Sequence, residues 1–312
     1  MLGAGVVTRA STGRVIDRFR DRVVFPIRDD EGLILGFVVR RHPDITDDDT
    51  AGPKYLNTGA TPLFHKGDQL YTTGALTSGT VPVIVEGPMD AIAVTLASGS
   101  RYVGVAPLGT ALTDQQAGQL SRLGQVTPIV ATDADLPGRI AAQRHYWILT
   151  PHGHDPRYAA LPDDTDPASL VATGHADTLT AALDQSQPLA HVLVDERLDH
   201  LPAAEGSLDA LRVVAAQPSQ QWEAGVQDIA GRVGLPASLL RPVLADLVTA
   251  WNRDPRAAGH NAVRDMHHVA IRLARHDGTD YEGAHVRPPR VPLEERAVVR
   301  APAPRRGPSR GR

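Results

Sequence analysis

The sequence of 312 residues contains no cysteine. Disulfide bonds and cysteine-ligated zinc ribbons are therefore excluded for this polypeptide, and no zinc is expected in it. Aromatic residues make up only 4% of the chain, so its core has to rely on Ala, Val and Leu. No apolar run reaches the roughly 18 residues of a membrane span, and the N-terminus lacks the pattern of a signal peptide. These absences predict a soluble cytoplasmic protein without a membrane partner.

Lysine is almost absent as well, because 30 of the 32 basic residues are Arg. The two exceptions are Lys54 and Lys66. A Lys retained against such a bias indicates a place that needs a compact charge on a flexible stem. Chance retention is the alternative interpretation.

Net charge is −4 and gives no sign of a nucleic-acid partner by itself. Its distribution is uneven, because residues 287–312 carry eight Arg and two Glu, a net of +6 that leaves −10 for the rest. This Arg- and Pro-rich segment cannot bury a core and is predicted to be disordered. It either binds a nucleic-acid backbone by counterion release or only keeps the chain soluble.

The order of apolar runs predicts three kinds of structure along the chain. Residues 15–75 read as a small mixed sheet, with a hairpin turn at "DDEG". Residues 80–195 alternate continuous apolar strands with helices, which indicates a buried parallel sheet. Residues 200–255 are helical, and "GVQDIAGRVGLPASLLRPVL" predicts two helices around a tight turn. A plain bundle is favoured there over a helix-turn-helix DNA reader. The polar stretch "NRDPRAAGHN" is predicted to be a linker before one further helix.

Carboxylates follow the ends of three predicted strands. Glu86 ends the first strand and Asp90 comes one helical turn later, while Asp133 and Asp135 follow the third strand two residues apart. A further group follows the fourth strand, namely Asp163, Asp164 and Asp166. A single Asp at such a place is usually a helix cap, but three groups in consecutive strand–helix units favour one shared site.

Clustered carboxylates repel one another unless a cation neutralises them. Ligands that are all oxygen favour Mg²⁺ or Mn²⁺ over zinc. The chemistry that such a site supports is phosphoryl transfer. Two pairs of histidines, His152 with His154 and His267 with His268, have no further ligands nearby in sequence, and we interpret them as surface residues.

The motifs resemble a TOPRIM domain, the sheet shared by bacterial primases, topoisomerases and some nucleases. "EGPMDAI" is similar to its glutamate motif and "TDADLPGRIAA" to its D-x-D motif. The flanking segments "DRFRDRVVFPIRDDEGLILGFVVR", "GPKYLN" and "TPLFHKGDQLY" resemble, in order and spacing, the part that precedes TOPRIM in DnaG-type bacterial primases. The resemblance covers roughly residues 12–251.

This resemblance implies an α/β fold, with a TOPRIM-type parallel sheet flanked by helices. Residues 1–78 would be part of a small mixed α+β basic subdomain and 79–195 the TOPRIM domain. Residues 196–255 would be a helical subdomain, 256–286 a linker and helix, and 287–312 the disordered tail.

The resemblance also implies roles for matching residues. Glu86, Asp133 and Asp135 would be catalytic and hold the metal ions, and Asp90, Asp164 and Asp166 would complete the acidic site. A basic surface that binds nucleotides or DNA would be formed by Arg40, Lys54, Asn57 and Lys66. Arg18, Arg20 and Arg22 either extend that surface or form a solvated strand edge.

Four positions depart from the family pattern, namely Pro88 in place of an aromatic residue, Ala134 in place of Gly, and the Leu136–Pro137 pair that follows Asp135. The carboxylates are all present, so we expect an intact metal site. A zinc-binding domain, the first part of the basic subdomain and a helicase-binding domain have no counterpart in the sequence.

The function implied is that of a DNA primase, a nucleotidyltransferase that makes short RNA primers on single-stranded DNA from nucleoside triphosphates. A replicative helicase, a relaxase or a separate zinc-binding protein are the further partners that this function would involve. Two alternatives stay open at this point. One is a non-catalytic or partner-dependent TOPRIM nucleic-acid-binding protein of a mobile element, and the other is a TOPRIM nuclease.

Overall fold

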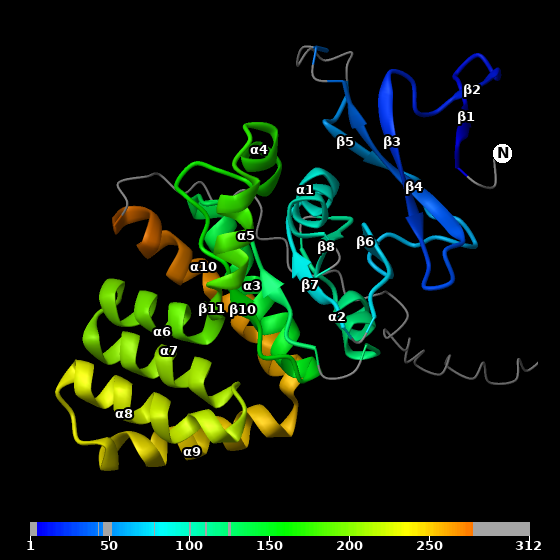
Figure 1. Ribbon diagram of the computed structural model, residues 1–312. Helices are drawn as coiled ribbons and strands as arrows, with labels where there is room; N and C mark the ends of the chain where they lie inside the picture. Colours follow the sequence, from blue (N-terminus) through cyan, green and yellow to red (C-terminus); the bar gives the residue numbers. More distant parts are fainter. Residues whose placement is uncertain are drawn as a thin grey trace, which may run out of the picture.

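A small antiparallel sheet, a larger mostly parallel sheet and a group of helices follow one another along the chain (Figure 1). The computed structural model describes residues 5–42, 44–45, 52–77, 79–99, 101–109, 111–123 and 126–276, with the backbone alone at 267–268 and 271–276. None of the helices in this part of the chain is both long and apolar enough to cross a lipid bilayer.

The small sheet has the strand order β3-β4-β5, with all pairs antiparallel. Its strands are β3 (Arg22–Arg28), β4 (Ile34–Arg41) and β5 (Tyr55–Asn57). The predicted hairpin is confirmed, because Asp29 Oδ1 accepts hydrogen bonds from the backbone N–H groups of Glu31 and Leu33 in the turn between β3 and β4. A separate ribbon pairs β1 (Val7–Arg9) with β2 (Val15–Asp17).

The central sheet has the order β11-β10-β9-β7-β8-β6. Its strands are β6 (Leu70–Thr72), β7 (Val81–Ile84), β8 (Tyr102–Pro107), β9 (Ile129–Val130), β10 (Arg157–Tyr158) and β11 (Gln187–Pro188). The four inner strands run parallel, as predicted, and the two edge strands β6 and β11 run antiparallel to their neighbours. One edge strand thus comes from the region before residue 78.

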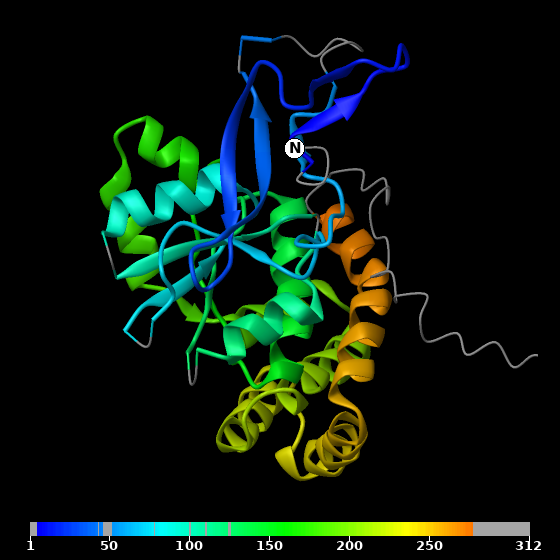
Figure 2. The same cartoon turned by 90° about the vertical axis from the view of Figure 1, so that its right-hand side faces the viewer.

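Helices cover both faces of the central sheet, because its inner strands are apolar on both sides (Figures 1 and 2). One face buries Val83 and Val85 against α1 (Pro88–Ser98) and α5 (Ala176–Asp184), with α4 (Pro167–Ala172) beside them. The other face buries Ile84 against α2 (Asp114–Ser121) and α3 (Leu136–Leu149). A 3-10 turn at Thr150–His152 follows α3 directly.

The C-terminal helices form a bundle rather than an isolated helix-turn-helix unit. They are α6 (Leu189–His200), α7 (Ala203–Ala215), α8 (Trp222–Val233), α9 (Ala237–Arg253) and α10 (Pro255–His276), with a 3-10 turn at Ser219–Gln221 before α8. The predicted tight turn between α8 and α9 is confirmed, because Gly234 takes a left-handed conformation with φ 68°. Helix α10 returns from the bundle and packs along α3 (Figures 1 and 2).

Two predictions about smaller features are wrong. The stretch 252–261 is not a linker, because α9 runs to Arg253 and α10 begins at Pro255, with Asp254 accepting a hydrogen bond from the Ala257 N–H. His152 and His154 are not surface residues, because the His152 side chain is only 6% exposed and His154 is buried. The side chains of residues 267 and 268, and the segment 287–312 predicted to be disordered, lie outside the described residues.

Candidate active site at the edge of the central sheet

Glu86 and Asp133 meet at the carboxyl edge of the central sheet. β7 and β9 are parallel neighbours, with Ile84 opposite Val130, so the residues that follow the two strands emerge at the same edge. Glu86 Oε1 accepts a hydrogen bond of 3.4 Å from the Asp133 backbone N–H. The first two carboxylates of the predicted site are therefore brought together by strand pairing.

Asp90 joins them from the first turn of α1. Its Oδ1 accepts a hydrogen bond of 3.3 Å from the Ala168 N–H, which belongs to the first turn of α4. Asp166 lies at the N-terminus of the same helix, where its Oδ1 accepts from the Ser169 N–H at 2.6 Å. The packing of α1 on α4 thus adds two carboxylates to the edge where Glu86 and Asp133 lie.

Asp135 and Asp164 occupy different surroundings. Asp135 is the N-cap of α3 and accepts a hydrogen bond of 2.7 Å from the Gly138 N–H. Asp164 is exposed, in a left-handed conformation with φ 55°, and does not line the cavity described below. The turn from Asp133 into α3 is very tight, since a Cβ atom on Gly138 would come within 2.0 Å of the Asp133 carbonyl oxygen.

Mutual repulsion and burial shift the acid–base properties of these carboxylates. Desolvation, followed by the negative charge of Glu86, raises the pKa of Asp133 to about 7. Desolvation and the charge of Asp166 raise the pKa of Asp90 to about 6. The pKa of Glu86 is raised mainly by desolvation too, although its side chain still reaches solvent. The charges of this group are therefore not compensated within the protein itself.

Cationic side chains share a cavity of about 730 Å³ with the carboxylates. The sequence-predicted residues that line it are Glu86, Asp90, Asp133 and Asp166, together with Arg40, Lys54, Asn57 and Lys66, which we call the cationic wall. Arg40 and Asn57 come from β4 and β5 and Lys54 precedes β5, whereas Lys66 lies in the segment that leads into β6. The cavity therefore lies between the two sheets and needs both.

Two arginines bind backbone carbonyls near the cationic wall. The sequence allows two interpretations of these arginines, as part of the binding surface or as a solvated strand edge. Arg22 donates to the carbonyl oxygen of Pro53 at 2.7 Å, and Arg18 donates to that of Asn57 at 3.4 Å. Both side chains thus brace the segment that carries Lys54 and Asn57. Tyr55 lies in the same segment, with the Arg40 guanidinium 6.0 Å from its ring centre.

Some contributors were not predicted as site residues from the sequence. The Ala168 N–H bonds Asp90 across 78 positions, and any residue type except proline has such a backbone group. Leu108 and Gly109, which follow β8, also line the cavity. Leu108 accepts a hydrogen bond of 2.6 Å from the Asn57 side-chain amide. Only the three-dimensional arrangement identifies these groups.

The carboxylates suit a hard divalent cation by their chemistry. They offer only oxygen donors, and a cation would relieve the repulsion that raises their pKa values. Among the described residues, no group of three or more His, Cys, Asp or Glu is already drawn together in a geometry that would hold a metal. A cation would therefore have to draw the carboxylates closer.

A larger cavity of about 810 Å³ lies among α7, α9 and α10. Its walls include Trp147, Trp251 and several alanines, and its buried Arg197 is already paired with Asp209 at 2.7 Å. Other carboxylates that line it also have partners, since Asp254 accepts a hydrogen bond from the Ala257 N–H and Asp265 lies 3.6 Å from Arg264. The smaller cavity is therefore the better candidate for an active site.

Comparisons with known proteins point to one family. Residues 1–76 match the family model "DNA primase catalytic core, N-terminal domain", and residues 83–171 match the "Toprim-like" model. A DNA primase of Pseudomonas putida is 39% identical over 207 residues, which are 63% of this chain and 30% of that primase. The chain therefore spans less than a third of this relative.

Solved structures of primase domains match a larger share of this chain and of their own chains. A DNA primase domain from Pseudomonas aeruginosa is similar with a TM-score of 0.63 and 33% identity, over 80% of this chain and 78% of that one. A DnaG primase catalytic domain bound to single-stranded DNA is similar with a TM-score of 0.64 and 31% identity, over 77% of each chain.

Proposed function

Because the chain belongs to the family of DnaG-type primase catalytic cores, we propose that it joins nucleotides into short RNA primers on a single-stranded DNA template. The observation that carries this proposal is the cavity that Glu86, Asp90, Asp133 and Asp166 share with Arg40, Lys54 and Lys66. A triphosphate needs cationic side chains for its oxygens, and the reacting phosphate needs compensation of the charge that develops on it.

Glu86, Asp90 and Asp133 are the residues that would hold Mg²⁺ or Mn²⁺, with Asp166 beside them. When bound, such an ion supplies positive charge at the reacting phosphate and at the oxygens around it. Asp135 contributes by fixing the start of α3, so that the Asp133 backbone keeps its place. Asp164 would not contact the ion and would add only its negative charge near the site.

The cationic wall would bind the triphosphate of the incoming nucleotide. Lys54 and Lys66 offer compact charges on flexible stems, and Arg40 offers a planar fork. The reaction is attack of a 3′ hydroxyl on the α-phosphate with departure of pyrophosphate. Arg40 and the two lysines would orient the triphosphate for this displacement, and Asn57 is held beside them by Leu108.

Single-stranded DNA is the template in this proposal. The structural relative solved with single-stranded DNA supports it, together with the Arg-rich small sheet. A helicase, a relaxase or a separate zinc-binding protein stay predictions from the sequence resemblance.

Primer synthesis tests the proposal directly. Purified protein would be incubated with mixed-sequence single-stranded DNA, labelled ribonucleotides and Mg²⁺ or Mn²⁺. We expect short labelled products from the wild type and at least a roughly 100-fold loss in Asp133→Ala, because the loss removes charge compensation at the reacting phosphate. Asp246→Ala, which removes an exposed carboxylate from α9, is the matched control and should retain activity.

The alternatives give different results in the same samples. Cleavage of the DNA without added nucleotides, dependent on metal and on Asp133, would indicate a nuclease. DNA binding without any product from the wild type, in either metal, would contradict the proposal and favour a binding protein.

A further inference from the structure

We propose that α2 is a bracket that positions Lys66 for the nucleotide triphosphate, with Gln119, Gln116 and Thr113 as positioning residues. The proposal rests on the primase function proposed above and adds to it how one of the two lysines is held. None of these three residues lines the catalytic cavity, so each would act through Lys66.

The side chain of Lys66 lies close against the backbone at Gly109. A Cβ atom on Gly109 would come within 3.3 Å of Lys66 Cε and 3.8 Å of Nζ. Gly109 follows β8, beside the Leu108 carbonyl that accepts from Asn57. The end of β8 thus contacts two residues predicted to bind nucleotides. Gly109 packs against the aliphatic part of Lys66, and the Leu108 carbonyl binds the side-chain amide of Asn57.

The turn after Lys66 is held by side chains of α2. Thr113 Oγ1 donates to the Gly67 carbonyl oxygen at 2.5 Å, and Gln116 Nε2 donates to that of Gln69 at 2.8 Å. Gln119 makes two further bonds, since its Oε1 accepts from the Leu70 N–H at 3.0 Å and its Nε2 donates to Gln69 Oε1 at 2.6 Å. Four hydrogen bonds therefore fix residues 67–70.

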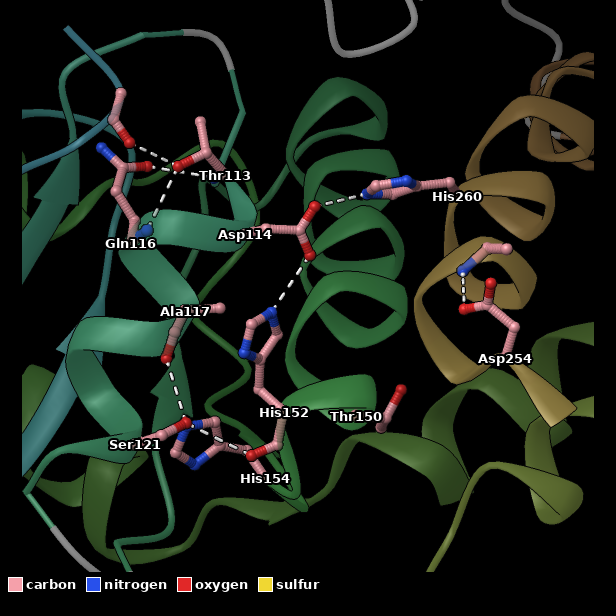
Figure 3. Close-up of polar contacts among 12 residues, drawn as sticks. Thr113, Asp114, Gln116, Ala117, Ser121, Thr150, His152, His154, Asp254 and His260 are labelled. Carbon is pink, nitrogen blue, oxygen red and sulfur yellow. Dashed lines mark hydrogen bonds and ion pairs between the residues drawn. The ribbon is translucent and has the colours of Figure 1, made fainter. Parts of the chain in front are cut away.

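α2 is itself rigidly anchored, so it can serve as a support. Thr113 and Gln116 form a reciprocal capping box, and Gln116 is only 1% exposed. On the other side of the helix, Asp114 contacts His152 at 3.0 Å and His260 of α10 at 2.7 Å (Figure 3). The bracket is thus tied to the turn after α3 and to α10.

A lysine on a loose turn loses side-chain and backbone freedom when it binds a phosphate, and that loss weakens binding. Fixing the turn and the stem beforehand removes part of the loss. Losing the bracket should therefore weaken nucleotide binding through Lys66 without changing the carboxylates. If the bonds only support the fold, losing them would reduce the amount of folded protein but leave the affinity of the folded part unchanged.

Gln119→Ala tests the bracket, with Gln115→Ala as the matched control. Both residues are glutamines of α2, but Gln115 is exposed and has no contact with residues 66–70 among the interactions described. Binding of ATP with Mg²⁺ would be measured by titration calorimetry. We expect the dissociation constant to rise roughly five-fold in Gln119→Ala, as for the loss of one or two hydrogen bonds, and to stay unchanged in Gln115→Ala.

A Lys66→Ala background separates positioning from general damage. There Gln119→Ala should add nothing to the dissociation constant, because the residue through which it acts is gone. Hydrogen exchange at the Leu70 amide, which needs no bound nucleotide, should accelerate in Gln119→Ala and not in Gln115→Ala. Gln119→Glu keeps an acceptor for that amide and should restore its protection.

The failures of the two proposals can be told apart. If the wild type does not bind ATP, the proposed function falls and the positioning role falls with it. If the wild type binds but Gln119→Ala binds equally well, or still weakens binding in the Lys66→Ala background, only the bracket is overturned. A rise confined to proteins that retain Lys66 supports it.

Discussion

At the scale of single residues, Asp133 shows how clustered carboxylates that suit a cation lower the stability of the folded protein when no cation is bound. Its carboxylate lies beside that of Glu86, and its pKa is raised to about 7. An Asp whose pKa in the folded protein lies above its ordinary value stabilises the fold at low pH. That contribution is lost as the pH rises through the folded-state pKa, here between about 4 and 7.

Asp133→Asn should therefore stabilise the metal-free protein at pH 8 by about 1–2 kcal/mol, because it removes an uncompensated charge. The gain should shrink towards pH 5, where the wild-type carboxyl is already protonated. Thermal unfolding in a chelator, at both pH values, measures it. Added Mg²⁺ should raise the melting temperature of the wild type at pH 8 more than that of the variant. A variant less stable than the wild type at pH 8 would contradict the repulsion described here.

A second prediction for a single residue concerns Gly138. Its missing side chain leaves room for the Asp133 carbonyl oxygen, which a Cβ atom would meet at 2.0 Å. Gly138→Ala should cost at least about 2 kcal/mol of stability and displace Asp133. Gly231→Ala is the matched control, because Gly231 lies within α8 with open space around its Cβ position. There alanine should stabilise by about 0.5–1 kcal/mol, and chemical denaturation of both variants checks the contrast. Equal effects would mean that the turn at Asp133 can widen.

At the scale of helices and strands, periodicity and turn residues locate part of the elements. Apolar runs at Val81–Ile84 and Tyr102–Pro107 became the parallel strands β7 and β8, and the Gly234 turn separates α8 from α9 as expected. The linker predicted after Trp251 is wrong, because polarity predicts a linker only when no tertiary partner stabilises a helix there. Helix α10 has such a partner in α3.

The carboxylates show the same limit at the ends of elements. Asp135 and Asp166 cap α3 and α4, which is the ordinary role of an Asp after a strand or before a helix. Glu86, Asp90 and Asp133 instead lie close enough to one another for their negative charges to repel. One residue type serves both purposes, so sequence spacing places carboxylates at the sheet edge but cannot tell a cap from a candidate ligand. The hydrogen bonds within each turn make that distinction.

At the scale of the whole molecule, Asp114 joins three parts of the chain. It binds His152 from the turn after α3 and His260 from α10 (Figure 3). The hydrogen bond from His152 is the main reason that the pKa of Asp114 is lowered. A lowered Asp pKa contributes stability above the ordinary pKa, and this contribution is lost as the pH falls through the folded-state value. This hydrogen bond should therefore link α2 to the turn after α3 at neutral pH, and the 2.7 Å contact with His260 extends the link to α10.

Asp114→Asn should loosen α10 and destabilise the protein by about 1–2 kcal/mol at pH 7. Hydrogen exchange of the α10 amides near His260 should accelerate more than that of α8. The control is Asp177→Asn, since Asp177 also lies in the first turn of a helix but has no histidine partner among the described contacts. Unchanged exchange in α10 would show that its packing on α3 suffices without Asp114.

The edge strand β6 has a consequence for how this architecture can be divided. Leu70–Thr72 precede the sequence boundary at residue 78, yet they pair with Val105–Pro107 of β8. A polypeptide cut at that boundary would leave one side of β8 with unpaired backbone groups and a bare apolar edge. A protein that received only the residues after position 78 would thus have an incomplete sheet, with an exposed edge that can pair with other chains. We expect a segment that keeps this sheet complete to start upstream of β6, at the turn that follows Lys66.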